Sequence, residues 1–113
     1  MKTTNAAASL HTPANDYANF VIAILKGTGL KSATARLMLT PQSAVTVSGA
    51  FNLNTPDAKL NSNVPWGLGW GLQETKNGKF FWHWGDNNGD VHCFVIASEK
   101  QKSGVVIFTD SGN

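Results

Sequence analysis

The stretch WGLGWGLQETKNGKFFWHWGDNN, residues 66–88, carries the strongest fold signal in the chain. Two apolar runs flank Asn77-Gly78, and Asn-Gly in that setting is typical of a tight β-hairpin. The second run, FFWHW, ends in a polar, glycine-bearing segment, and the connecting turn is expected over Asp86–Asp90. Strand ends that lead into loops are places where a scaffold presents functional side chains. The stretch therefore predicts a hairpin with a candidate site at one end.

Two later segments extend this pattern. Residues 91–98 and 104–109 are rich in Val, Ile and Phe, and short polar turns separate them. Residues of these types favour strands. Together with 67–75 and 79–84 they predict four strands, and connections this short require antiparallel neighbours. We therefore expect an antiparallel sheet over residues 66–110.

The N-terminal part of the chain predicts helices. Within 12–26, apolar residues recur with helical spacing from Tyr17 to Leu25, and Gly27 ends the run. Ala18, Ile22 and Ala23 fill much of the other side, so we expect this helix to be buried on more than one face. A second short helix is expected over 32–39, which places the helical segment within residues 12–40. Residues 41–65 are rich in Ser, Thr, Asn and Pro and predict a long irregular loop. The fold class is thus α+β, with two N-terminal helices followed by a four-stranded antiparallel meander.

The predicted strands are apolar on both faces. In the second strand, Phe80, Trp82 and Trp84 alternate with Phe81 and His83. An antiparallel sheet with one face in water would instead alternate apolar and polar residues. Two helices cover roughly one face, so we expect a further partner for the other. We therefore interpret residues 1–113 as a single partial domain, completed by more of the same polypeptide or by a homodimer through the uncovered sheet face.

Composition excludes several classes of function. The net charge is +2, but the nine Lys and Arg residues are scattered and form no basic stripe, so no nucleic-acid partner is expected. No segment reaches the ~18 apolar residues of a membrane span. The N-terminus is too polar for a signal peptide. Cys93 is the single cysteine, which excludes an internal disulfide, and we expect it to act as a small buried hydrophobe.

His83 allows two interpretations. It shares a strand face with Gly85, where a histidine can polarise a substrate or carry a proton. It can equally be a structural histidine within an aromatic wall. A metal site built from His83, Asp86, Asp90 and His92 fits no ordinary zinc spacing, and an Asx-rich turn explains these residues better. We therefore expect no metal and no cofactor.

The tryptophans and the serines bear on the function as well. The four tryptophans could form a stacking platform for sugars or bases, but strands that are apolar throughout favour a core or interface role (Trp66, Trp70, Trp82 and Trp84). The serines lie in neither a Gly-x-Ser-x-Gly elbow nor a Ser-x-x-Lys helix start. The chain therefore shows no self-contained serine nucleophile.

Four stretches, taken in order, resemble the C-terminal part of serine β-lactamase-like hydrolases. This superfamily includes class C β-lactamases, penicillin-binding-protein-like peptidases and esterases. The stretches are AASLHTPANDYANFVIAIL (7–25), WGLGWGL (66–72), HWG (83–85) and GVVIFTDSGN (104–113). The third resembles the family's third active-site motif, which is Lys-Thr-Gly in β-lactamases and His-x-Gly in many esterase-like members. Each motif is weak alone, whereas the ordered series is fairly specific.

The resemblance implies candidate catalytic roles for three residues. His83 would take the place of the third-motif lysine, and Gly85 would leave room for the helix that bears the nucleophile. The backbone N–H of Asp86 would be the second oxyanion-hole donor. Trp84 stands where β-lactamases have a hydroxyl that holds the substrate carboxylate, which argues against β-lactam turnover. Trp84 and Asn87 are the expected substrate-binding residues.

The nucleophile and base motifs of the family, Ser-x-x-Lys and Tyr-x-Asn, lie upstream in its members and are absent from this sequence. The resemblance therefore implies part of a hydrolase that acts on an ester, amide or peptide through an acyl-serine, and that is inactive as this piece. It also suggests a periplasmic or extracytoplasmic location. The alternative is a non-enzymatic ligand-binding or interaction module that uses the Trp-rich sheet.

Overall fold

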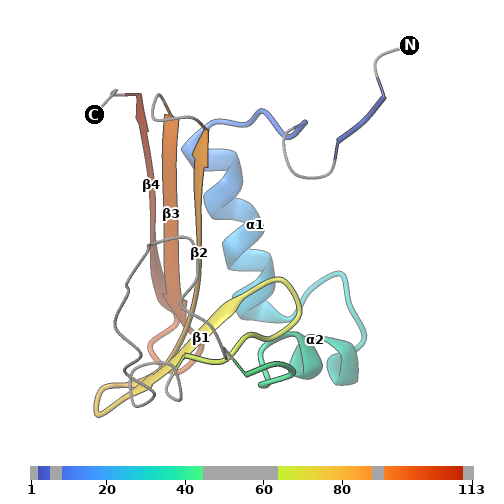
Figure 1. Cartoon of the computed structure of the whole chain (residues 1–113). Helices are drawn as coiled ribbons and strands as arrows, with labels where there is room; N and C mark the ends of the chain where they lie inside the picture. Colours follow the sequence, from blue (N-terminus) through green and yellow to red (C-terminus); the bar gives the residue numbers. More distant parts are fainter. Residues whose placement is uncertain (1–2, 6–8, 45–63, 88–90, 111–113) are drawn as a thin grey trace.

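The computed structural model describes residues 3–5, 9–44, 64–87 and 91–110. Two helices precede four strands: α1 (Ala14–Lys26), α2 (Ser32–Met38), β1 (Gly71–Thr75), β2 (Gly78–Asn87), β3 (Val91–Ser98) and β4 (Ser103–Asp110) (Figure 1). The strands form one sheet in the order β1-β2-β3-β4, and all neighbours are antiparallel. The predicted α+β class, with two helices and a four-stranded meander, is confirmed.

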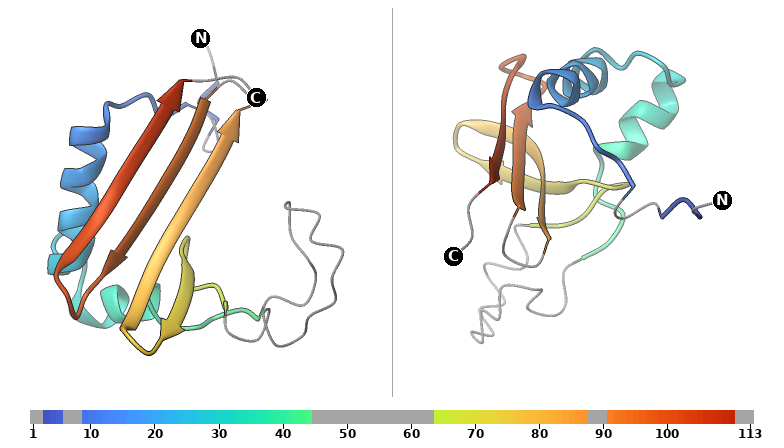
Figure 2. Two further views of the ribbon diagram at one scale, coloured as in Figure 1. Left: turned by 90° about the vertical axis from the view of Figure 1, so that its left-hand side faces the viewer. Right: turned by 90° about the horizontal axis from the view of Figure 1, so that it is seen from above.

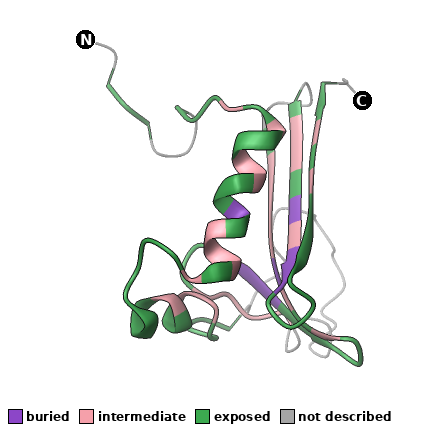
Figure 3. Cartoon of the chain, turned by 180° about the vertical axis from the view of Figure 1, so that it is seen from behind, coloured by how far each residue is buried: buried purple, intermediate pink, exposed green. Residues whose placement is uncertain are grey.

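Both helices lie on the same side of the sheet (Figure 2). Helix α1 packs across β3 and β4, where the ring of Tyr17 lies 5.7 Å from that of Phe108. Gly27 ends α1 in the left-handed conformation, with φ 63°, as the sequence predicts. The buried apolar core between the helix and the sheet consists of Val21, Trp70, Leu72, Phe81, Val95 and Ala97 (Figure 3).

The strand register separates two faces of the sheet. Phe81 pairs with Ala97, His83 with Val95 and Gly85 with Cys93, so these side chains share the inner face, toward α1. The intervening residues, including Trp82, Trp84 and Phe94, belong to the outer face. This arrangement puts His83 and Gly85 on the same side of the sheet as the helices.

The outer surfaces of this two-layer structure keep much apolar area in contact with solvent. On the outer face of the sheet, Phe94, Val105 and Ile107 are 39%, 52% and 47% exposed. On α1, Phe20 and Ile22 are also exposed, although the apolar pattern of this segment predicted burial on more than one side. Among the described residues, no helix covers this outer face, and the apolar patterning of the strands predicted that the two helices would cover only one face.

Two strand boundaries differ from the sequence-based prediction. Strand β1 begins at Gly71, not at residue 67, because the preceding residues form a turn in which Gly69 has φ 78°. Strand β2 continues to Asn87, although a turn was predicted from Asp86, because Asp86 and Asn87 pair with His92 and Val91. The candidate residues 83–87 therefore lie on a strand and not on a loop.

Most of the predicted irregular loop, residues 41–65, falls outside the described residues. Its described ends are held together by an antiparallel bridge between Ser43 and Trp66. Neither α1 nor α2 has the length and apolarity that crossing a membrane requires.

Candidate functional site

A cavity of about 580 Å³ opens on the inner face of the sheet, beside the C-terminal half of β2. Its volume lies in the range of small-molecule sites. It brings together His83, Gly85 and Asp86 from β2 with residues before and within α1. The full described lining is Leu10, His11, Thr12, Tyr17, His83, Gly85, Asp86, Val91, Cys93, Phe94, Val95 and Phe108.

The cavity exists because the inner face is unevenly filled. Trp70 packs edge-on against Phe81, with ring centroids 5.0 Å apart, and covers the first half of β2. Helix α1 lies over β3 and β4 instead. The space above His83 and Gly85 is left between these two covers, which exposes the imidazole to a ligand or to another polypeptide segment.

Gly85 and Cys93 fit closely against each other. A Cβ atom at residue 85 would lie 2.8 Å from the Cys93 Sγ atom. The thiol therefore occupies the space that a side chain at position 85 would need. Cys93 is half-buried on the cavity wall, so it is more accessible than the buried hydrophobe expected from the sequence.

Tyr17 contributes a hydroxyl to the same cavity. Burial of the side chain raises the pKa of this phenol above 10.0, and the nearby Cys93 raises it further. The hydroxyl accordingly stays protonated at neutral pH and can donate a hydrogen bond to a group in the cavity. Sequence reasoning placed Tyr17 only on the apolar side of a helix.

Asp86 borders the cavity, and its carboxylate also reaches a neighbouring strand. Its Oδ1 atom lies 3.7 Å from Nδ1 of His92, the residue opposite it on β3. Within the described residues, His92 Nε2 is buried without a hydrogen-bond partner. No three His, Cys, Asp or Glu side chains of the described chain gather as a metal site requires, and Asp90 lies outside the described residues.

The other predicted site residues are placed differently. Trp84 pairs with Phe94, lies on the outer face and does not line the cavity. Asn87 is the last residue of β2 and pairs with Val91, but its side chain lies outside the described part of the structure. The structure therefore groups His83, Gly85 and Asp86 and separates Trp84 from them.

Beyond Trp82, β2 is no longer paired with β1. Pairing between β1 and β2 ends at Gly71 and Trp82, whereas β2 continues for five more residues. Residues 83–87 thus extend beyond the end of β1. The candidate residues lie at a margin of the sheet as well as beside a cavity.

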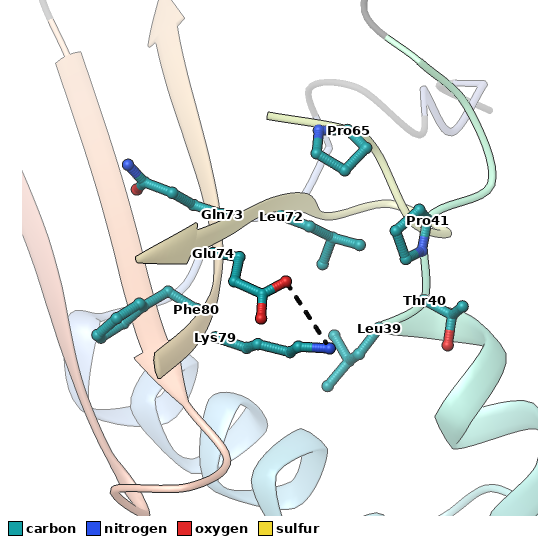
Figure 4. Close-up of a pocket in the computed structure, with 9 residues that line it drawn as sticks. All are labelled: Leu39, Thr40, Pro41, Pro65, Leu72, Gln73, Glu74, Lys79 and Phe80. Atoms are coloured by element: carbon teal, nitrogen blue, oxygen red, sulfur yellow. Dashed lines mark ion pairs between the residues drawn. The ribbon is translucent and has the colours of Figure 1, made fainter. Parts of the chain in front are cut away.

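A second cavity, of about 350 Å³, lies between the end of α2 and the β1–β2 hairpin (Figure 4). Leu39, Pro41, Pro65 and Leu72 form its apolar side. Its charged residues are Glu74 and Lys79, an exposed pair 3.9 Å apart, and exposed pairs contribute little. Figure 4 shows that Glu74 and Lys79 pair with each other. Fewer polar groups are therefore left to bind a ligand here than in the cavity at His83.

Comparisons with known proteins found no relative of this chain. No family model matches the chain, and no curated protein or solved structure is detectably similar to it.

Proposed function

We propose that residues 1–113 carry one wall of an acyl-transfer site, as part of a serine hydrolase of the β-lactamase-like superfamily. The substrate would be a small ester, amide or peptide, hydrolysed through an acyl-serine. The observation that carries the proposal is His83 beside Gly85 on the inner face of β2, above an open cavity of substrate size. The order of the four family-like sequence stretches supports it.

In this proposal His83 polarises the substrate or carries a proton at the reacting centre. The backbone N–H of Asp86 donates to the oxyanion of the tetrahedral intermediate, and a donor of this kind contributes roughly 3–4 kcal/mol to lowering the barrier. The nucleophile and its base come from polypeptide outside residues 1–113. The cavity wall formed by Gly85 and Cys93 is where the nucleophile-bearing segment approaches.

The test uses the natural protein that contains these residues, with a chromogenic ester as substrate. His83→Gln should lower kcat by about 10²–10⁴-fold, the usual range for a general acid or base. Asp86→Ala keeps the backbone N–H and should retain most activity. Equal loss in both variants would contradict the assignment of a backbone donor at residue 86.

For the 113-residue chain by itself, we propose that the outer sheet face is covered by a second copy. Three strands of eight to ten residues give a face of roughly 400 Å² per copy, from ~3.3 Å per residue and ~4.8 Å between strands. Two copies would bury roughly 800 Å², which is below the ~1,200 Å² of standard specific interfaces, so the expected association is weak and transient. The exposed Phe94, Val105 and Ile107 supply the apolar contact.

A second candidate function is a non-enzymatic binding module that uses the same outer face. The exposed aromatic ring of Phe94, opposite the half-buried Trp84, favours it. Such a module should bind a peptide or glycan as a monomer, with a change in tryptophan fluorescence. Phe94→Ala should weaken that binding, whereas His83→Gln should not.

A further inference from the structure

We propose that the turn formed by residues 66–70, WGLGW, positions the imidazole of His83, and that Trp66 and Trp70 are positioning residues for it. This inference rests on the proposed function for the role of His83. It assigns to the two tryptophans a task beyond core packing: they fix the direction in which the imidazole faces the cavity.

The ring contacts carry this inference. The ring of Trp66 lies 5.6 Å from that of His83, at an interplanar angle of 84°. The ring of Trp70 lies 6.4 Å from it, at 85°. Both contacts are edge-to-face, a preferred geometry of aromatic pairs. The imidazole is therefore in contact with two indoles, one from each end of the same short turn.

Each indole is itself held by a second ring. Trp66 contacts Trp82 at 5.5 Å, and Trp70 contacts Phe81 at 5.0 Å. Trp82 and Phe81 are the two residues that precede His83 on β2, and they point to opposite faces. Trp66 thus contacts side chains of both faces of β2, whereas Trp70 contacts Phe81 and His83 on the inner face.

The backbone of the turn is fixed as well. Trp66 donates its N–H to the carbonyl of Ser43 at 2.8 Å, and Gly67 donates to the carbonyl of Trp70 at 2.8 Å. Leu68 donates to the carbonyl of Met38 at the end of α2, at 3.0 Å. A Cβ atom at Gly67 would overlap that same Met38 carbonyl oxygen, so only glycine permits this approach.

Core packing alone does not explain Trp66. Trp70 is 4% exposed and belongs to the buried core, whereas Trp66 is half-buried at the sheet margin and does not. Among the described residues, no hydrogen bond orients the His83 imidazole, so the ring contacts take that task. Catalytic histidines are commonly oriented by a hydrogen bond to one ring nitrogen. Here both ring nitrogens can remain available to the cavity.

The test is NMR of the imidazole C–H groups in the 113-residue chain. The native protein should show nuclear Overhauser effects from the His83 ring to both indoles, and an order parameter well above that of the exposed His11. Trp66→Leu should lower the His83 order parameter toward that of His11, and Trp66→Phe should restore it. Phe80→Leu, which removes a ring from the outer face and away from the lining of the His83 cavity, is the matched control and should leave His83 unchanged. Backbone amide spectra report whether each variant is folded.

A mobile His83 ring in the native chain would overturn the inference, even if Trp66→Leu fails to fold. An unchanged order parameter in a folded Trp66→Leu variant would overturn it too. In the natural protein, Trp66→Leu should lower kcat about 10- to 100-fold with little effect on KM, as expected for a misoriented group. An ordered His83 in a protein without hydrolase activity would contradict the proposed function and leave this inference standing. A disordered His83 in an active hydrolase would contradict this inference and leave the proposed function standing.

Discussion

Tyr17 and Cys93 line the same cavity on the inner face of the sheet, although 76 positions separate them in the sequence. A helix in the N-terminal quarter brings the phenol, and β3 brings the thiol. Both therefore join His83 in one cavity. Local sequence patterns cannot reveal this grouping, because it depends on where α1 crosses the sheet. Only the position of Cys93 opposite Gly85 could have been predicted, from the register of two neighbouring strands.

Tyr17 is the single tyrosine, so its ionisation can be followed directly by absorbance. Burial first, and Cys93 second, raise its pKa above the ordinary 10.0. We expect the native phenol to ionise above pH 10 and the urea-unfolded phenol near 10. Because the folded pKa is the higher one, this residue's contribution to stability is complete below pH 10 and is lost as the pH rises through the folded pKa. Cys93→Ala should lower the native pKa without returning it to 10.0, whereas a native pKa of 10 or less would contradict the described burial.

The contact between Gly85 and Cys93 predicts coupled stability effects. Gly85→Ala should lower the free energy of unfolding by about 1 kcal/mol, because the new methyl group meets Sγ at 2.8 Å and the thiol must rotate away. With Cys93→Ala in the background, the same substitution should cost little. Urea unfolding of the four proteins in a double-mutant cycle measures the coupling. Strict additivity would mean that the two residues do not touch.

At the scale of elements, the turn at residues 66–70 links α2 to the sheet, and its two inner glycines have different tasks. Gly69 has φ 78° with open space around its Cα, whereas Gly67 approaches the Met38 carbonyl closely. We expect Gly67→Ala to cost about 3 kcal/mol, at the upper end for overpacking. Gly69→Ala should cost about 1 kcal/mol, from the left-handed backbone alone. Urea unfolding compares them, and a larger cost for Gly69→Ala would contradict the close approach.

The strands show where sequence patterns suffice and where they fail. Asn77-Gly78 and the apolar runs predict the β1–β2 hairpin, because hairpin chemistry is local. The polar residues after Gly85 predicted a turn that begins at Asp86, but pairing with β3 draws Asp86 and Asn87 into the ladder. Pairing between strands outweighs the turn preference of Asx residues here. Gly69 at positive φ likewise makes β1 shorter than predicted. The sequence Gly67-Leu68-Gly69 alone does not show which backbone conformation this glycine adopts.

At the scale of the whole molecule, two layers leave apolar residues exposed on both outer sides. Patterning of the strands predicted the need for a second cover, since this property follows from alternation alone. The position and volume of the cavity could not be predicted, because they depend on the packing of α1 and Trp70 over different parts of the sheet.

The exposed sheet face predicts weak self-association of the 113-residue chain. Sedimentation velocity should show a monomer at low concentration and a growing dimer fraction at high concentration. Ile107→Lys on β4 should abolish the dimer, because a charge would be buried without a partner. Ile22→Lys is the matched control, since Ile22 is 43% exposed on α1 and Ile107 is 47% exposed on the sheet. A concentration-independent monomer, or equal effects of both variants, would contradict a dimer through this face.

We propose that residues 1–113 hold the His83 wall of a serine-hydrolase site whose nucleophile lies outside them. It is tested most directly by a fluorophosphonate probe, with intact-mass and peptide mass spectrometry, on the 113-residue chain and on the natural protein that contains it. We predict no adduct on the 113-residue chain. In the natural protein we predict one adduct, on a serine outside these residues, that forms at least ~10²-fold more slowly in His83→Gln. An adduct on a serine within residues 1–113, or a labelling rate that does not depend on His83, would contradict the account.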